Sequence, residues 1–208
     1  MRALQLRNAW PTRCWRPTPH NRQPWIADLR SEPDIVLICD GQRLLPETDP
    51  HGRQILIGCG AFIELAVIAA QSQGVAVAVE MFPAGEPGAA AVPAGTTVAR
   101  LRLGARASAA PDPLFSHVRQ RHTNKSAYAD NRPLPRELSA DWQSSAERFG
   151  LRFGVVGGAA SADVRRITHE AYEIECLTPR TWLESARLMR IGPDEISRHR
   201  DGITLNSP

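Results

Sequence analysis

The chain is poor in cysteine, and none of its four cysteines stands in the C-x-x-C spacing of a zinc site or a redox pair. They are Cys14, Cys39, Cys59 and Cys176. Cys39 and Cys59 lie among apolar residues, which is typical of reduced thiols in a cytoplasmic protein. The histidines also lack neighbouring ligands that would complete a metal site. We therefore expect a cytoplasmic protein without a disulfide framework or a bound metal.

A strong charge, a secretory signal and a membrane span are also missing. The net charge of +3 is spread evenly over the chain, so there is no basic footprint for nucleic acid. The first 27 residues hold five arginines and no acid, but they lack the apolar core of a secretory signal. The apolar run 55–70 is shorter than the roughly 18 residues of a span, and Glu64 interrupts it. Neither nucleic acid nor a membrane is expected as a partner.

Several catalytic signatures are absent as well. No G-x-G-x-x-G motif follows a predicted strand, and no phosphate-loop lysine motif occurs. Ser116 and Ser126 lack the strand–turn–helix context of a nucleophile elbow. No side chain is therefore assigned a catalytic role, and the candidates that remain are residues suited to binding.

The stretch Asp49–Gly74 is predicted to form a central helix. Asp49 can cap its start, Pro50 suits the first helical position, and Gly74 suits a left-handed stop. Apolar residues occupy every face of the run, so the helix should be buried on all sides. It is interpreted either as the central helix of an α+β domain or as an ordinary buried helix without a functional role.

The segments around this helix predict an α+β fold in two halves. Composition divides the chain into a loosely ordered N-terminus at 1–16, a first half at 17–110 and a second half at 111–208. Strands are expected near 25–30, 35–39, 75–82, 96–103 and 151–156. Helices are expected at 114–120, 136–149, 161–177 and 179–189, with Ser161 as the cap of the third.

Arg121, Thr123 and Lys125 form the first candidate binding group. In an extended segment alternate residues face the same side. Two cations flanking a hydroxyl on that side can hold a phosphate through charge-assisted hydrogen bonds. The alternative interpretation is a solvated basic loop without a ligand.

The loop Pro17–Trp25 carries the second candidate group. Its three prolines exclude a regular helix and make the loop rigid. The side-chain amides of Asn21 and Gln23 can donate and accept hydrogen bonds, which suits the polar edge of a planar heterocycle. His20 could donate to a ligand or carry a proton. The alternative is that these side chains only make hydrogen bonds that fix the loop.

Together these motifs resemble the Acg-type branch of the flavin-dependent nitroreductase superfamily, in which two half-units are fused in one chain. The resemblance covers about residues 17–205 and combines a P-x-x-H-N-x-Q-P-W loop, a D-x-x-R-x-L-P-x-x-D-P turn, a C-G-A helix, an R-x-T-N segment, a P-L-P and an R-D-G-I. The matching residues are Pro17, His20, Asn21, Gln23, Pro24, Trp25, Asp40, Arg43, Leu45, Pro46, Asp49, Pro50, Cys59, Gly60, Ala61, Arg121, Thr123, Asn124, Lys125, 133–135 and 200–203.

The resemblance implies a mixed sheet flanked by helices around the central helix, and one site for flavin mononucleotide (FMN) between two half-units. It implies that Arg121, Thr123 and Lys125 hold the phosphate, and that the loop with Pro17, Thr18, His20 and Asn21 meets the ribityl chain or the ring. The expected activity is transfer of two electrons from NAD(P)H to a small acceptor, with the flavin performing the redox chemistry. A flavin-binding or sequestering protein without turnover, and an inactive remnant, are the alternatives.

Three departures from the family pattern bear on these expectations. Pro17, Thr18 and Pro19 stand where two serines are usual, and Lys125 replaces an arginine, which weakens bidentate phosphate binding. Family members also continue well beyond 208 residues, so the second half-unit is expected to be incomplete and to lack the helix that packs on Asp49–Gly74. A homodimer through the central helix is the first expectation, and a borrowed partner chain or a partly unfolded, aggregation-prone chain are the alternatives.

The expected dimer rests on four large side chains of the central helix. A single sheet with short helices would leave them exposed, and each would forfeit about 1.5–3 kcal/mol. They are Ile57, Phe62, Leu65 and Ile68.

Overall fold

The computed structural model describes residues 17–30, 33–88, 92, 94–106, 112–124, 126–127, 129, 132 and 134–205, so the predicted N-terminal segment 1–16 lies outside the described residues. The chain forms two compact units. Unit 1 consists of Met1–Thr123 together with Pro179–Pro208, and unit 2 is Asn124–Thr178. The predicted division into half-units at residue 110 stays a prediction.

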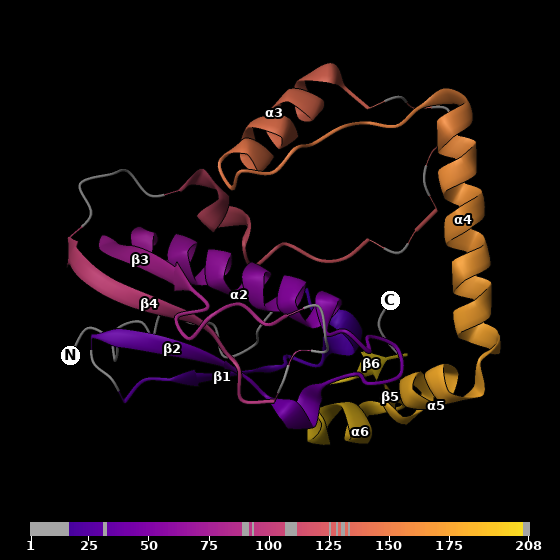
Figure 1. Ribbon diagram of the computed structural model, residues 1–208, viewed down its shortest axis with the longest axis horizontal. Coiled ribbons are helices and arrows are strands. Elements are labelled where there is room, and N and C mark those ends of the chain that lie inside the picture. Colours follow the sequence, from indigo (N-terminus) through magenta and orange to yellow (C-terminus); the bar gives the residue numbers. More distant parts are fainter. Residues whose placement is uncertain are drawn as a thin grey trace. The chain divides into compact units, whose positions relative to one another are not determined.

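A four-stranded antiparallel sheet forms the centre of unit 1 (Figure 1). Its strands are β1 (Trp25–Asp28), β2 (Asp34–Cys39), β3 (Val75–Met81) and β4 (Thr97–Arg106), in the spatial order β1-β2-β4-β3. Helix α2 (Arg53–Ser72) lies along one face. Among the described strands, parallel pairing occurs between β5 (Met189–Arg190) and β6 (Ile203–Thr204), which form a separate two-stranded sheet. The predicted α+β class is confirmed.

The alternation predicted for residues 96–103 is present in β4. Leu101 and Leu103 are buried beneath α2. Arg100 and Arg102 point to the opposite face, where Arg102 is 2.9 Å from the Glu80 carboxylate. One face of the sheet is therefore apolar and covered by α2, while the other is charged and solvated, as is common in antiparallel sheets.

Helix α2 begins later than predicted and ends where predicted. Gly52 precedes its first turn with a left-handed backbone (φ 66°), so Pro50 lies outside the helix. Asp49 still serves the helix start, because its buried carboxylate accepts a hydrogen bond from the Ile55 N–H at 2.9 Å. Gly74 has φ 70°, in agreement with the predicted left-handed stop.

The prediction that α2 is buried on every face is wrong at Ile57, which is 72% exposed. The prediction that Phe62 and Ile68 would be exposed without a partner helix is also wrong, since they are only 2% and 4% exposed. Besides the sheet, α2 contacts two short 3₁₀ helices, η1 (Pro19–Asn21) and η3 (Pro113–His117). A homodimer through α2 stays a prediction, now supported mainly by Ile57.

By length and composition α2 could also cross a membrane. It has 20 residues and a mean hydropathy of 1.9, so the argument that its apolar run is too short does not apply to the whole helix. Half of the apolar window is buried inside the structure, however. Core helices pass the same criterion, and a single such helix is only a weak indication of a membrane span.

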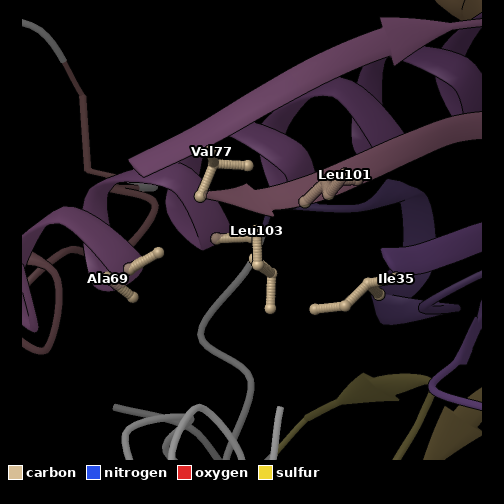
Figure 2. A pocket seen from close by; sticks show the side chains of 7 residues that line it. Ile35, Ala69, Val77, Leu101 and Leu103 are labelled. Atoms are coloured by element: carbon tan, nitrogen blue, oxygen red, sulfur yellow. The ribbon is translucent and has the colours of Figure 1, made fainter. Parts of the chain in front are cut away.

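A small apolar cavity lies between α2 and the sheet (Figure 2). Its volume is about 10 Å³. It is lined by Ile35, Ala66, Ala69, Ala70, Val77, Leu101 and Leu103. Pockets for cofactors and drug-sized ligands usually measure roughly 300–1,000 Å³. This cavity is therefore a packing gap in the core and is too small to hold a cofactor.

The C-terminal segment of the chain packs onto the first part of unit 1. It contains α5 (Pro179–Arg187), β5, α6 (Pro193–Arg198) and β6. The Glu184 carboxylate accepts hydrogen bonds from the N–H groups of Glu47 and Thr48 at 3.2 and 2.9 Å, and from the Thr48 hydroxyl at 2.7 Å. No local pattern in the sequence predicts this attachment.

Unit 2 contains α3 (Arg136–Glu147) and α4 (Gly158–Leu177). The strand predicted at 151–156 is wrong, because these residues form neither helix nor strand. Val155 and Val156 have strand propensity, but a strand is stable only when it pairs with a neighbour. The predicted cap Ser161 is also wrong, since α4 begins three residues earlier, after Gly157.

Candidate functional site

The loop that begins at Pro17 has an unusual backbone. His20, Asn21 and Gln23 adopt positive φ angles of 50°, 51° and 49°. Each non-glycine residue in this region costs roughly 1–3 kcal/mol and persists only where the surrounding structure fixes it. Such strain is concentrated at functional sites, so the loop is a candidate site on structural grounds as well as by its sequence.

Gly58 of α2 allows the loop to approach the helix closely. A Cβ atom at this position would lie 3.3 Å from the Thr18 Cγ2 and 3.6 Å from the Pro17 carbonyl oxygen. A methyl group at this position would require the Thr18 side chain to shift by a few tenths of an ångström. The structure places Pro17 and Thr18 directly against the central helix.

The two amide side chains of the loop converge on one backbone carbonyl. Asn21 Nδ2 and Gln23 Nε2 donate to the Arg200 oxygen at 3.4 and 2.9 Å. Gln23 Nε2 also donates to Asn21 Oδ1 at 3.2 Å, and the Gln23 N–H donates to Thr18 Oγ1 at 3.2 Å. These side chains do fix the loop. Asn21 nevertheless keeps a second amide hydrogen and a second lone pair, so its capacity to bind a ligand is not exhausted.

An ion-pair cluster of Arg22, Arg190 and Asp201 anchors the loop. Arg22 lies 2.5 Å from one carboxylate oxygen of Asp201, and Arg190 lies 3.4 Å from the other. The three side chains are only 11–16% exposed. Arg22 also donates to the carbonyl oxygens of Gln42 and Arg43 at 2.7 and 3.3 Å. Arg22 stands between the left-handed residues Asn21 and Gln23, so its side-chain contacts hold this part of the loop in place.

Arg43 completes the cluster. It donates to the Arg22 carbonyl at 3.0 Å and lies 3.3 Å from the Asp40 carboxylate. Arg43 and Asp201 belong to the D-x-x-R and R-D-G-I motifs, but neither they nor Arg22 were among the predicted site residues. The two motifs were a signal for Arg43 and Asp201, whereas Arg22 stands at an unspecified position of the loop motif and had no such signal.

Two residues of the predicted phosphate clamp, Arg121 and Thr123, lie at the end of the Met1–Thr123 segment of unit 1. The Arg121 N–H donates to the His117 carbonyl at 2.9 Å, and the Arg121 side chain is half-buried. Thr123 is exposed and is the last residue of this part of unit 1. Lys125 lies outside the described residues. The role of these three residues therefore stays a prediction.

Cys59, in the C-G-A motif of α2, is a core residue. Burial, with a smaller contribution from nearby Cys39, raises the pKa of its thiol to about 12. Burial also raises the pKa of Cys39. At neutral pH both thiols are protonated and packed among apolar side chains, so neither is suited to nucleophilic or redox chemistry.

Alkylation should distinguish these thiols from Cys176. In the native protein at neutral pH we expect iodoacetamide to modify the exposed Cys176 and to leave Cys39 and Cys59 unmodified. All three should react after denaturation in urea. Mass spectrometry of the peptides measures each site. Fast native modification of Cys59 would show that α2 is not packed as described.

Fold and loop together define an α+β protein with a strained, firmly anchored loop against its central helix. No protein-family model matches the chain. It is 35% identical over 78 residues to "Putative NAD(P)H nitroreductase acg" of Mycobacterium tuberculosis. That match covers 38% of this chain and 23% of the relative. A second relative, the uncharacterized protein Rv3127 of the same organism, is 42% identical over 62 residues, which cover 28% of this chain and 18% of the relative. The matched stretches span less than a quarter of either relative.

Proposed function

We propose that the protein is a nitroreductase-like oxidoreductase that binds FMN and transfers two electrons from NAD(P)H to a small acceptor. The observation that carries the proposal is the 35% identity to a protein named as an NAD(P)H nitroreductase. The pre-formed loop with its P-x-x-H-N-x-Q-P-W sequence supports it. FMN, when bound, supplies the redox chemistry, and the protein supplies binding and orientation.

The loop residues fit a flavin ligand. The loop is already ordered, so little conformational entropy is lost when a ligand binds there. Pro17 and Thr18 present backbone and hydroxyl groups beside α2, and Asn21 retains one amide hydrogen for the ribityl chain or the ring edge. Arg121, Thr123 and Lys125 are proposed to hold the phosphate.

Absorption spectroscopy tests this function. Purified protein mixed with FMN and freed of excess ligand should retain a yellow chromophore, and NADH or NADPH should bleach it under anaerobic conditions. Riboflavin, which lacks the phosphate, should bind more weakly and serves as the ligand control. A colourless protein that does not bind added FMN contradicts the proposal. Binding without bleaching would instead favour a flavin-binding protein without turnover.

Asn21→Ala should weaken FMN binding by up to about tenfold, the equivalent of one neutral hydrogen bond. The thermal midpoint should change little, because Gln23 still donates to the Arg200 carbonyl. Titration by flavin fluorescence measures the affinity. Gln143→Ala, which removes an amide on α3, is the control and should leave the affinity unchanged. Loss of stability with unchanged affinity would show that Asn21 only fixes the loop.

A further inference from the structure

The N–H groups of Gln23 all donate to acceptors within the protein. Its side-chain nitrogen Nε2 donates to the Arg200 carbonyl oxygen at 2.9 Å and to Asn21 Oδ1 at 3.2 Å. Its backbone N–H donates to Thr18 Oγ1 at 3.2 Å. A glutamine amide has two N–H donors, and both are used in these contacts. The Gln23 side chain therefore has no donor left for a ligand, although it stands in the loop that is a candidate binding site.

The contacts of the Asn21 side chain depend on Gln23. Asn21 Nδ2 lies 3.4 Å from the Arg200 oxygen, which is longer than the usual N–H···O distance of about 2.7–3.2 Å. The shorter contact to this oxygen comes from Gln23. Of the hydrogen bonds described for the Asn21 side chain, the one that Gln23 donates to Oδ1 is therefore the better formed.

The Arg200 carbonyl determines which way round both amides stand. A carbonyl oxygen can only accept, so the atoms of Asn21 and Gln23 that face it must be nitrogens. With Nε2 of Gln23 fixed in this way, the Asn21 atom that accepts from it must be the oxygen. A flipped Asn21 amide would bring two NH₂ groups together and two oxygens together. Arg200 therefore orients Gln23, and Gln23 orients Asn21.

We propose that Gln23 is a positioning residue, which holds the Asn21 amide in the orientation that its remaining N–H needs to reach an acceptor atom of the flavin. The inference rests on the proposed function, because it concerns the same loop and the same ligand. Asn21 keeps one amide hydrogen for that ligand, whereas the Gln23 side chain keeps none. The effect of Gln23 on binding is therefore exerted through Asn21.

Gln23→Met removes the two side-chain donors while the loop keeps its other anchors. The backbone N–H still donates to Thr18, and Arg22 still pairs with Asp201. Water can replace Gln23 at the Arg200 carbonyl, since this contact is exposed, so the thermal midpoint should change little. The dissociation constant for FMN should rise by up to about tenfold, because the Asn21 amide is free to rotate.

Gln73→Met is the matched control for Gln23→Met. It makes the same change at an exposed glutamine just after α2. This variant should bind FMN with the affinity of the parent. Equal affinity of Gln23→Met and the parent would overturn the positioning role and leave the proposed function intact.

A double-mutant cycle distinguishes positioning from direct contact with the ligand. If Gln23 acts only through Asn21, the double variant Asn21→Ala/Gln23→Met should bind FMN as Asn21→Ala does. Independent contacts would instead multiply, to about a hundredfold loss in the double variant. Titration by flavin fluorescence measures the four affinities. Multiplied effects would show that Gln23 touches the ligand itself and would overturn the proposal.

Nuclear magnetic resonance tests the orientation without a ligand. The side-chain amide signals of Asn21, identified by their absence in Asn21→Ala, should shift in Gln23→Met and stay in place in Gln73→Met. Unchanged signals in Gln23→Met would overturn the positioning role. A parent chain that binds no FMN would overturn the proposed function and the ligand part of this inference, whatever the amide signals show.

Discussion

Replacing both Arg121 and Lys125 with alanine is expected to weaken FMN binding by about a hundredfold or more. Each cation should contribute a charge-assisted hydrogen bond to the phosphate, worth roughly 1.5–3 kcal/mol. Added salt should also weaken binding by the parent protein, because it screens the same interaction. Fluorescence titration with FMN measures both effects.

The control variant for this experiment also loses two positive charges, but at positions outside the clamp. Arg119 and Arg136 are exposed residues near the clamp in the sequence, and the double replacement by alanine should leave the affinity within about twofold. Riboflavin should bind the clamp variant and the parent with similar affinity, since it has no phosphate. Equal FMN affinity of parent and clamp variant would show that the phosphate is bound by other residues.

Asp201→Ala is expected to lower the free energy of unfolding by about 3–5 kcal/mol. Its carboxylate is the acceptor for both Arg22 and Arg190, and all three side chains are largely buried. Removing one partner of a buried ion pair leaves the remaining charge without compensation, which is why the cost is high. It is large against a domain's total stability of roughly 5–15 kcal/mol. Urea denaturation followed by circular dichroism measures it.

Glu80→Ala is the comparison for Asp201→Ala. Glu80 pairs with Arg102 on the charged face of the sheet, where both side chains are about half exposed. Exposed ion pairs contribute about 0–1 kcal/mol, so the urea midpoint should change little. If the two variants are equally stable, the Arg22–Asp201 cluster is solvated in solution and does not anchor the loop.

The sequence predicted the parts of unit 1 that depend on local pattern. The alternation of Leu101 and Leu103 with Arg100 and Arg102 placed β4, and Gly74 marked the end of α2. Both patterns involve only neighbouring residues, so they can be recognised without knowledge of the tertiary structure. The α+β class follows from the order of these elements.

The loop anchor could not be predicted in the same way. Arg22 and Asp201 are separated by 179 residues, and no local periodicity links them. The coverage of Phe62 was missed for a similar reason, because the ring of Trp25, in β1, packs against it with centroids 4.9 Å apart. At 151–156 the error was of the opposite kind. The sequence has local strand propensity there, but the segment forms no strand in the structure.

The attachment of the loop to Arg200 and Asp201 has a consequence for biosynthesis. Chains emerge from the ribosome N-terminus first, and domains fold as their residues become available. The sheet and α2 are complete once Arg106 has emerged, whereas the carbonyl and carboxylate that hold the loop appear about 95 residues later. A nascent chain that has not yet reached Arg200 therefore carries the loop without its anchor. A ligand that needs the anchored loop could therefore bind there only after Arg200 and Asp201 have been synthesised.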